Sequence, residues 1–206
     1  MTPPLKMHSI SAVELLAREA GALALSHFKA LGSVPVESKG HLDLVTAADQ
    51  DVERFLTEGL VKIFPNDGIF GEEGAAHQGN SGRTWVIDPI DGTFNFVRGG
   101  DQWAISIGLY ESAQPIFGVI FVPLREQLLV GGVGLQSTLN GELIAQRSGL
   151  DTSRASCGVG FHPIIPVDLR LETLRFVIQD AGMSFRCCGS ATLSLIEVGL
   201  GQVDGY

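Results

Sequence analysis

Apolar residues in the first third of the chain recur with the period of an α-helix. Between residues 9 and 31 they return every three or four positions, which predicts a long amphipathic helix with Ser9 or Ser11 as its N-cap. A second helix follows, opened by Asp49 as N-cap and closed by Pro65. The apolar positions of the two helices are Val13, Leu16, Ala20, Leu23, Val52, Leu56, Leu60 and Ile63.

The middle of the chain changes to the short β-rich runs that are typical of a sheet. Gly68 to Gly71 predicts a short strand, and the apolar pair Val86-Ile87 predicts a buried one. Turn signals separate three longer runs, which are Trp103 to Tyr110, Pro115 to Val122 and Gln127 to Val130. Such short connections favour antiparallel pairing, and Gly131 to Gly134 and Asn140-Gly141 are typical of a bulge or of hairpin turns.

From about Leu150 onward, predicted strands and helices alternate, a pattern that indicates an α/β unit. The strands are expected at 157–160 and 185–187 and at the start of another from 203 to 206; the helices are expected at 168–182 and 190–199. We therefore expect an N-terminal α+β domain over residues 1–149, built on an antiparallel sheet and carrying the metal site. A partial C-terminal α/β domain would cover residues 150–206.

Composition and charge narrow the functional classes. The chain has 206 residues, of which 45% are hydrophobic, and a formal charge of −9 from 23 acidic and 14 basic residues. This charge argues against a nucleic-acid groove and accommodates an acidic cation site. Three cysteines, Cys157, Cys187 and Cys188, form no paired framework and fit a reducing cytosol. The absence of a signal core and of a run of about 20 apolar residues predicts a soluble, cytoplasmic protein without a membrane partner.

The strongest chemical signal is a pair of acids, Asp88 and Asp91, at the end of the Val86-Ile87 strand. Hard oxygen ligands beside the free N–H groups of a helix start suit a divalent cation held together with a phosphate. The same residues are also common in turns that have no functional role. Glu72-Glu73 could be solvated charge and Asp49 a simple N-cap, so spacing alone justifies only a suspicion of metal.

Three motifs in order resemble the inositol monophosphatase family of Mg²⁺-dependent, lithium-sensitive phosphatases. They are Asp43-Leu-Val-Thr-Ala-Ala-Asp49, Gly71-Glu-Glu73 and Asp88-Pro-Ile-Asp-Gly-Thr93, and the resemblance runs from about Lys39 to the last residue. It implies a layered αβαβα sugar-phosphatase-type fold, two or three Mg²⁺ ions, a small phosphate ester as substrate and a homodimer. Inositol monophosphate is the expected substrate. Histidinol phosphate, a nucleotide 3′-phosphate, or a non-catalytic regulatory role are the alternatives.

The resemblance also implies metal ligands. Glu72, Asp88 and the Ile90 carbonyl would hold the first ion, Asp88 and Asp91 would share the second, and Glu73 would lie in the outer shell of a third. Carboxylates and carbonyls are the ligands that Mg²⁺ prefers. Because side chains alternate in an extended chain, at most one of Glu72 and Glu73 is expected to face the site directly.

Catalytic and substrate-binding roles follow from the same resemblance. Glu72 and Thr93 would orient and deprotonate the attacking water, assisted by Asp49 through a hydrogen bond to the threonine hydroxyl. The residues implied to contact phosphate or substrate are Asp91, Gly92, Thr93, Gly189, Ser190 and Ala191. Lys39 and Asp43 match loop positions near the metals, or form a solvated surface pair.

The sequence departs from the family pattern at its end. The family pattern continues after the strand that begins near Tyr206 with a further glutamate and with a Trp-Asp motif whose aspartate completes the second metal site; neither occurs here. We expect this chain to be a fragment or an incomplete form, with a weak second metal site and impaired activity.

Overall fold

The computed structural model describes residues 5–31, 36–40, 43–145 and 154–206, and the side chains of 36–40 and 43–45 lie outside the description. The expectations for the side chains of Lys39 and Asp43 therefore fall outside the described part of the chain. The helices are α1 Met7–Lys29, α2 Ala47–Ile63, α3 Thr93–Val97, α4 Val167–Arg175 and α5 Ala191–Gly199, with a 3₁₀ turn η1 Pro123–Arg125 and a π-helix η3 Phe176–Asp180.

The described strands form three sheets. A hairpin pairs β1 Val36–Gly40 with β2 Asp43–Thr46. The central sheet has eight strands in the order β10-β9-β8-β7-β6-β5-β3-β4, and a parallel pair joins β11 Ser156–Gly158 to β12 Ser184–Arg186. The strands of the central sheet are β3 Gly68–Gly71, β4 Ala76–His77, β5 Arg83–Asp91, β6 Ala104–Glu111, β7 Gln114–Val122, β8 Gln127–Gly132, β9 Leu135–Leu139 and β10 Glu142–Leu143.

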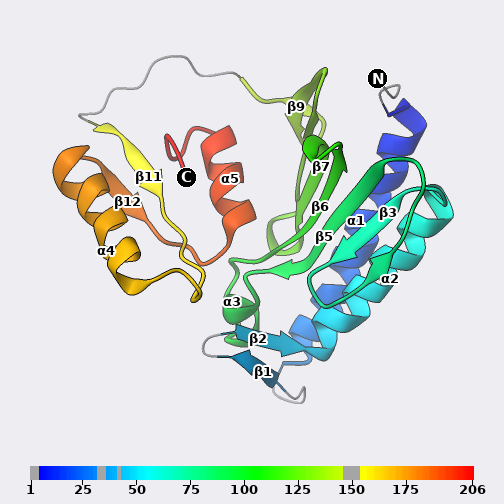
Figure 1. Cartoon of the computed structure of the whole chain (residues 1–206), viewed down its shortest axis with the longest axis horizontal. Helices are drawn as coiled ribbons and strands as arrows, with labels where there is room; N and C mark the ends of the chain where they lie inside the picture. The colour runs from blue at the N-terminus through cyan, green and yellow to red at the C-terminus, as the bar shows by residue number, and fades with distance from the viewer. Residues whose placement is uncertain (1–4, 32–35, 41–42, 146–153) are drawn as a thin grey trace.

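The elements lie in alternating layers of helix and sheet (Figure 1). Helices α1 and α2 cover one face of the central sheet, α5 lies on the other side, and the β11–β12 pair and α4 lie beyond it. The core between the sheet and the first two helices contains Trp85, Ile87, Leu109, Leu56 and Val13, all with at most 1% of their surface exposed. This arrangement is the layered α+β fold that the sequence predicts.

Antiparallel pairing of β6, β7 and β8 is confirmed, and Asn140 and Gly141, with φ of 51° and 83°, form the expected hairpin turn. The central sheet also contains one parallel pair, β3 with β5. At the chain end, a single parallel bridge joins Gly205 to Cys157. It lies at the start of the strand expected there. The division into domains at residues 149 and 150 stays a prediction.

Two predicted helix starts are wrong. Helix α1 begins at Met7 with Lys6 as N-cap, so Ser9 and Ser11 lie inside the helix. Helix α2 begins after Thr46, whose side chain accepts the Ala48 N–H, while Asp49 is the third helical residue and completes a capping box. A Thr-x-x-Asp sequence offers two candidate caps, and the N-cap is here the residue that still has an extended backbone.

The buried strand around Val86 also differs from expectation. Trp85 and Ile87 are buried, but Val86 is 37% exposed because strand side chains alternate between the two faces of the sheet. The strand does not stop at Asp88; it continues to Asp91, with an irregular register between these two residues. Asp88 therefore follows Val86 onto the face directed away from α1 and α2.

Candidate active site at the edge of the central sheet

Parallel pairing of β3 and β5 brings the first two acids together. The register places Gly71 opposite Ile87, so the next residues, Glu72 and Asp88, leave the same edge of the sheet side by side. Parallel strands end at a common edge, where ligands bind in open α/β sheets. Glu72 and Asp88, which the sequence predicts as metal ligands, therefore lie close together because of the strand register.

Two other acidic residues lie close enough to Asp88 to change its pKa. Burial, then the charges of Glu72 and Asp91, raise the pKa of Asp88 well above its ordinary value, and a side-chain hydrogen bond with Glu72 contributes in the same direction. The Ile90 N–H, 3.1 Å from Asp88 Oδ1, opposes this shift because it stabilises the charged form. Three predicted ligands, Glu72, Asp88 and Asp91, thus interact in the folded chain.

Asp91 is held by the start of α5. Its Oδ2 accepts hydrogen bonds from the Ser190 hydroxyl at 2.6 Å, the Thr192 N–H at 2.7 Å and the Thr192 hydroxyl, and its Oδ1 accepts the Ala191 N–H at 3.3 Å. An acid at a helix N-terminus satisfies donors that have no partner within the helix. The predicted substrate residues Ser190 and Ala191 therefore lie beside a predicted metal ligand.

As the side chains stand, no three acidic, histidine or cysteine residues of the described ranges form a group ready to hold a metal ion. Both carboxylate oxygens of Asp91 accept hydrogen bonds from the start of α5. The Ile90 carbonyl accepts the Thr93 hydroxyl at 3.0 Å and keeps a second lone pair. The donor set consists of oxygen atoms alone, which fits Mg²⁺.

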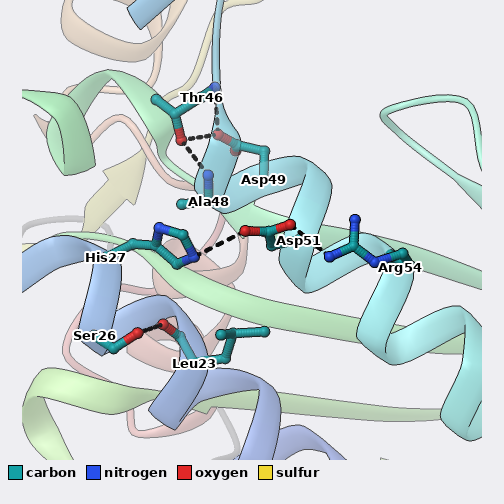
Figure 2. Close-up of polar contacts among 8 residues, drawn as sticks. All are labelled: Leu23, Ser26, His27, Thr46, Ala48, Asp49, Asp51 and Arg54. Carbon is teal, nitrogen blue, oxygen red and sulfur yellow. Dashed lines mark hydrogen bonds and ion pairs between the residues drawn. The ribbon is translucent and has the colours of Figure 1, made fainter. Parts of the chain in front are cut away.

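The expected contact between Thr93 and Asp49 is present. Thr93 Oγ1 lies 3.3 Å from Asp49 Oδ1. The other oxygen of Asp49 accepts both the N–H and the hydroxyl of Thr46, at 2.8 and 2.6 Å, as Figure 2 shows. Asp49 is only 1% exposed, and burial raises its pKa although these hydrogen bonds oppose the rise. Asp49 therefore holds the helix start and reaches the site.

Gly92 forms the sharp turn between β5 and α3. Its φ of +99° is a conformation that favours glycine. A Cβ at this position would lie 2.5 Å from the Gln102 carbonyl oxygen. The family resemblance implies a phosphate contact at Gly92, but close packing against Gln102 is a reason for glycine here that is independent of any ligand.

Two residues that sequence reasoning missed support the site. Asn95 Nδ2 donates to the carbonyls of Gln102 and Cys188, both at 2.8 Å, and so ties α3 to the segment that carries Gly189. Glu53 accepts the N–H groups of Glu73 and Ala75. A signal for Glu53 existed, since an acid four residues after Asp49 shares the buried helix face. No local signal identified Asn95.

Glu72 and Glu73 lie in the turn that follows β3, not in an extended strand, so strand alternation does not decide which of them faces the site; Glu73 packs toward α2. It lines a hollow against α2 together with Glu53 and Arg54. Its place in the outer shell of a third ion stays a prediction. Gly189, with φ of +76°, packs against the Asn95 amide at the turn before α5, and its substrate contact stays a prediction as well.

The fold and the carboxylate-lined sheet edge define a layered α+β protein of the phosphatase class. The chain belongs to the inositol monophosphatase family, whose model matches residues 7–206. The match begins at residue 7, so the resemblance includes α1 and is longer than the stretch from Lys39 that the motifs indicate.

Similar proteins come from several bacteria. A Nus factor SuhB of Xylella fastidiosa is 34% identical over 92% of this chain and 69% of its own length. A fructose-1,6-bisphosphatase/inositol-1-monophosphatase of Aquifex aeolicus is 29% identical over 95% of this chain and 75% of its own. The solved IMPase of Thermotoga maritima superimposes with a TM-score of 0.81 at 31% identity, over 96% of this chain and 74% of that one. The chain therefore spans about seven tenths of these proteins.

Proposed function

We propose that this chain is a Mg²⁺-dependent phosphomonoesterase acting on a small polyol phosphate, with inositol monophosphate as the substrate. The observation that carries the proposal is the meeting of Glu72, Asp88 and Asp91 at one sheet edge, seen in the effect of Glu72 and Asp91 on Asp88. Like charges gathered in a partly buried place are costly unless a cation offsets them. Membership of the family supports the same conclusion.

The residues suit two or three Mg²⁺ ions. Glu72, Asp88 and the Ile90 carbonyl would hold one, and Asp88 with Asp91 a second, with Glu73 outside a third. When bound, Mg²⁺ neutralises the phosphate and lowers the pKa of a water ligand. We expect lithium to inhibit the enzyme by competing at these oxygen sites.

The chain's own groups would position the reactants. The Thr93 hydroxyl, held between Asp49 Oδ1 and the Ile90 carbonyl, can accept a hydrogen bond from the attacking water and orient it, while Glu72 takes the proton. The N–H groups of Gly92 and Thr93 at the start of α3 would receive phosphate oxygens. Substrate hydroxyls would contact the Gly189-Ser190-Ala191 turn, which Asp91 holds.

A substrate panel tests the reaction. Initial rates with inositol 1-phosphate, histidinol phosphate, adenosine 3′,5′-bisphosphate and fructose 1,6-bisphosphate would be compared with and without Mg²⁺. The proposal predicts the highest kcat/KM for inositol 1-phosphate and no turnover in Asp88→Asn. A preference for histidinol phosphate or for the nucleotide would replace the substrate assignment, and Mg²⁺-independent turnover would overturn the mechanism.

A regulatory role is the second candidate, because one similar protein is described as a Nus factor. Such a role would not need hydrolysis. If Asp88→Asn abolishes turnover but retains binding to the transcription machinery, the regulatory role is favoured. Loss of every cellular phenotype together with hydrolysis would count against it.

We also propose that the chain forms a homodimer and acts in the cytoplasm. Helix α4 buries none of its side chains, and exposed apolar residues gather on it and on η3.

Cys157, Cys187 and Cys188 are free thiols, as a reducing compartment would leave them. No helix in the described residues is long and apolar enough to cross a membrane.

A further inference from the structure

Glu53 is a buried acid with an unusual set of partners. It is 4% exposed and lies on the face of α2 that also buries Val52 and Leu56. Its Oε2 accepts the Glu73 N–H at 2.6 Å, and its Oε1 accepts the Ala75 N–H at 2.8 Å. A buried carboxylate is stable when such charge-assisted hydrogen bonds satisfy it. Both oxygens of Glu53 are therefore committed to the backbone just after Glu72.

The turn that follows β3 is shaped to receive this acid. The Gly71 N–H donates to the Ala75 carbonyl at 2.7 Å and closes the turn. A Cβ on Gly71 would clash with Oε2 of Glu53, so the glycine permits the close approach. Glu72 thus lies between a residue packed against Glu53 and a residue hydrogen-bonded to it.

We propose that Glu53 is a positioning residue that fixes the backbone of Glu72 so that the Glu72 carboxylate faces Asp88. This inference rests on the proposed function, because it gives Glu53 its role through the predicted cation ligand Glu72. Glu53 itself does not touch the substrate or the cation. A partner that orients a metal ligand in this way typically changes metal affinity or activity roughly 10- to 100-fold when it is replaced.

The chemistry of the turn requires a carboxylate at position 53. Two N–H donors converge on the side chain, and a carboxylate offers an acceptor to each. A glutamine has the same length but only one acceptor oxygen, so its NH₂ group would face the second donor. Glu53→Gln therefore disturbs the turn while it removes little volume.

The test compares Glu53→Gln with Asp51→Asn. Both variants remove one negative charge from α2, but Asp51 contacts His27 and Arg54, not the turn (Figure 2). Binding of Mn²⁺ and Mg²⁺ to the metal-free protein would be measured by calorimetry, and amide exchange at Glu73 and Ala75 would be followed in the absence of metal. Glu53→Gln should weaken cation binding by roughly 10- to 100-fold and speed exchange at both amides. Asp51→Asn should change affinity less than about twofold, because its partly exposed charge is screened and is paired with His27 and Arg54.

A rescue experiment separates positioning from general damage. If Glu53 acts through Glu72, excess Mg²⁺ should restore most of kcat in Glu53→Gln, whereas Glu72→Gln should not recover. A folded Glu53→Gln with the cation affinity of the natural chain would overturn the proposal. Should Glu53→Gln fail to fold, Gly71→Ala tests the same contact from the other side and must give the same loss of affinity. If the natural chain binds no divalent cation, the proposed function is wrong. The positioning role of Glu53 is then wrong as well, because it depends on that function.

Discussion

Asp88 shows how a single residue can be unfavourable for the fold and still be required by the proposed chemistry. Its pKa is raised by burial and by two neighbouring acids. A group whose pKa is raised on folding adds stability below its ordinary pKa and loses it as the pH rises through the folded value. Without metal, Asp88 therefore lowers the free energy of unfolding as the pH rises from its ordinary pKa through the raised pKa of the folded chain.

We expect Asp88→Asn to stabilise the metal-free protein while it abolishes the response to Mg²⁺. The gain should be about 1 kcal/mol, or about 2–4 °C in Tm, near pH 8, and should vanish near pH 4, where the natural Asp88 is protonated. Thermal melting in EDTA and in Mg²⁺ would measure both effects. A variant less stable than the natural chain near pH 8 in EDTA would contradict the charge crowding.

Gly92 allows a second prediction at the residue scale, with an internal control. Gly92 and Gly99 both have positive φ, +99° and +73°, but only the Cβ of the first would meet the Gln102 carbonyl, since that of the second meets open space. Gly99→Ala should cost about 1 kcal/mol for its backbone alone, and Gly92→Ala about 2–4 kcal/mol because of the added clash. Urea unfolding would measure the two costs, and equal values would remove the packing argument.

The elements that form the site were predictable to different degrees. Periodicity located both long helices, and the Asp88 motif located the central acids. The meeting of Glu72 with Asp88 depends on the parallel register of β3 and β5, and no local pattern specifies which strands pair. Ser190 and Asp91 are 99 residues apart, so their hydrogen bond arises only when α5 packs on the sheet. Local propensity could not have supplied it.

Asn95 is the link between these elements, and its role can be tested. Asn95→Ala leaves the carbonyls of Gln102 and Cys188 without their shared donor, which should lower the free energy of unfolding by about 2 kcal/mol. Amide exchange should accelerate at residues 190–192, where Asp91 holds the start of α5. Asn95→Asp keeps the size but presents oxygen to both carbonyls, so it should be at least as damaging. If Asn95→Asp is neutral, the tie between α3 and the second half of the chain is not important.

At the scale of the whole molecule, the layers leave α4 and η3 on the outside, beyond the β11–β12 pair (Figure 1). The apolar residues more than half exposed from the loop before α4 through η3 are Ile164, Val167, Leu169, Leu171, Phe176 and Ile178. Exposed apolar surface of this extent is typical of an interaction site. Sequence periodicity predicted a helix here but not its exposure, because an apolar stripe facing a partner looks the same as one facing a core.

We therefore expect the chain to sediment with twice its mass of 21.9 kDa, and Leu171→Asp to shift it to the mass of one chain. Leu15→Asp is the matched control, because Leu15 is 57% exposed, against 59% for Leu171, but lies on α1 in the outer layer at the other side of the molecule. A charge in an apolar interface must be desolvated without a partner, whereas the same charge on a free surface stays in water. Sedimentation velocity over a range of concentrations would measure the masses. A monomeric natural chain would contradict the homodimer, and a Leu171→Asp variant that stays dimeric would place the interface away from α4.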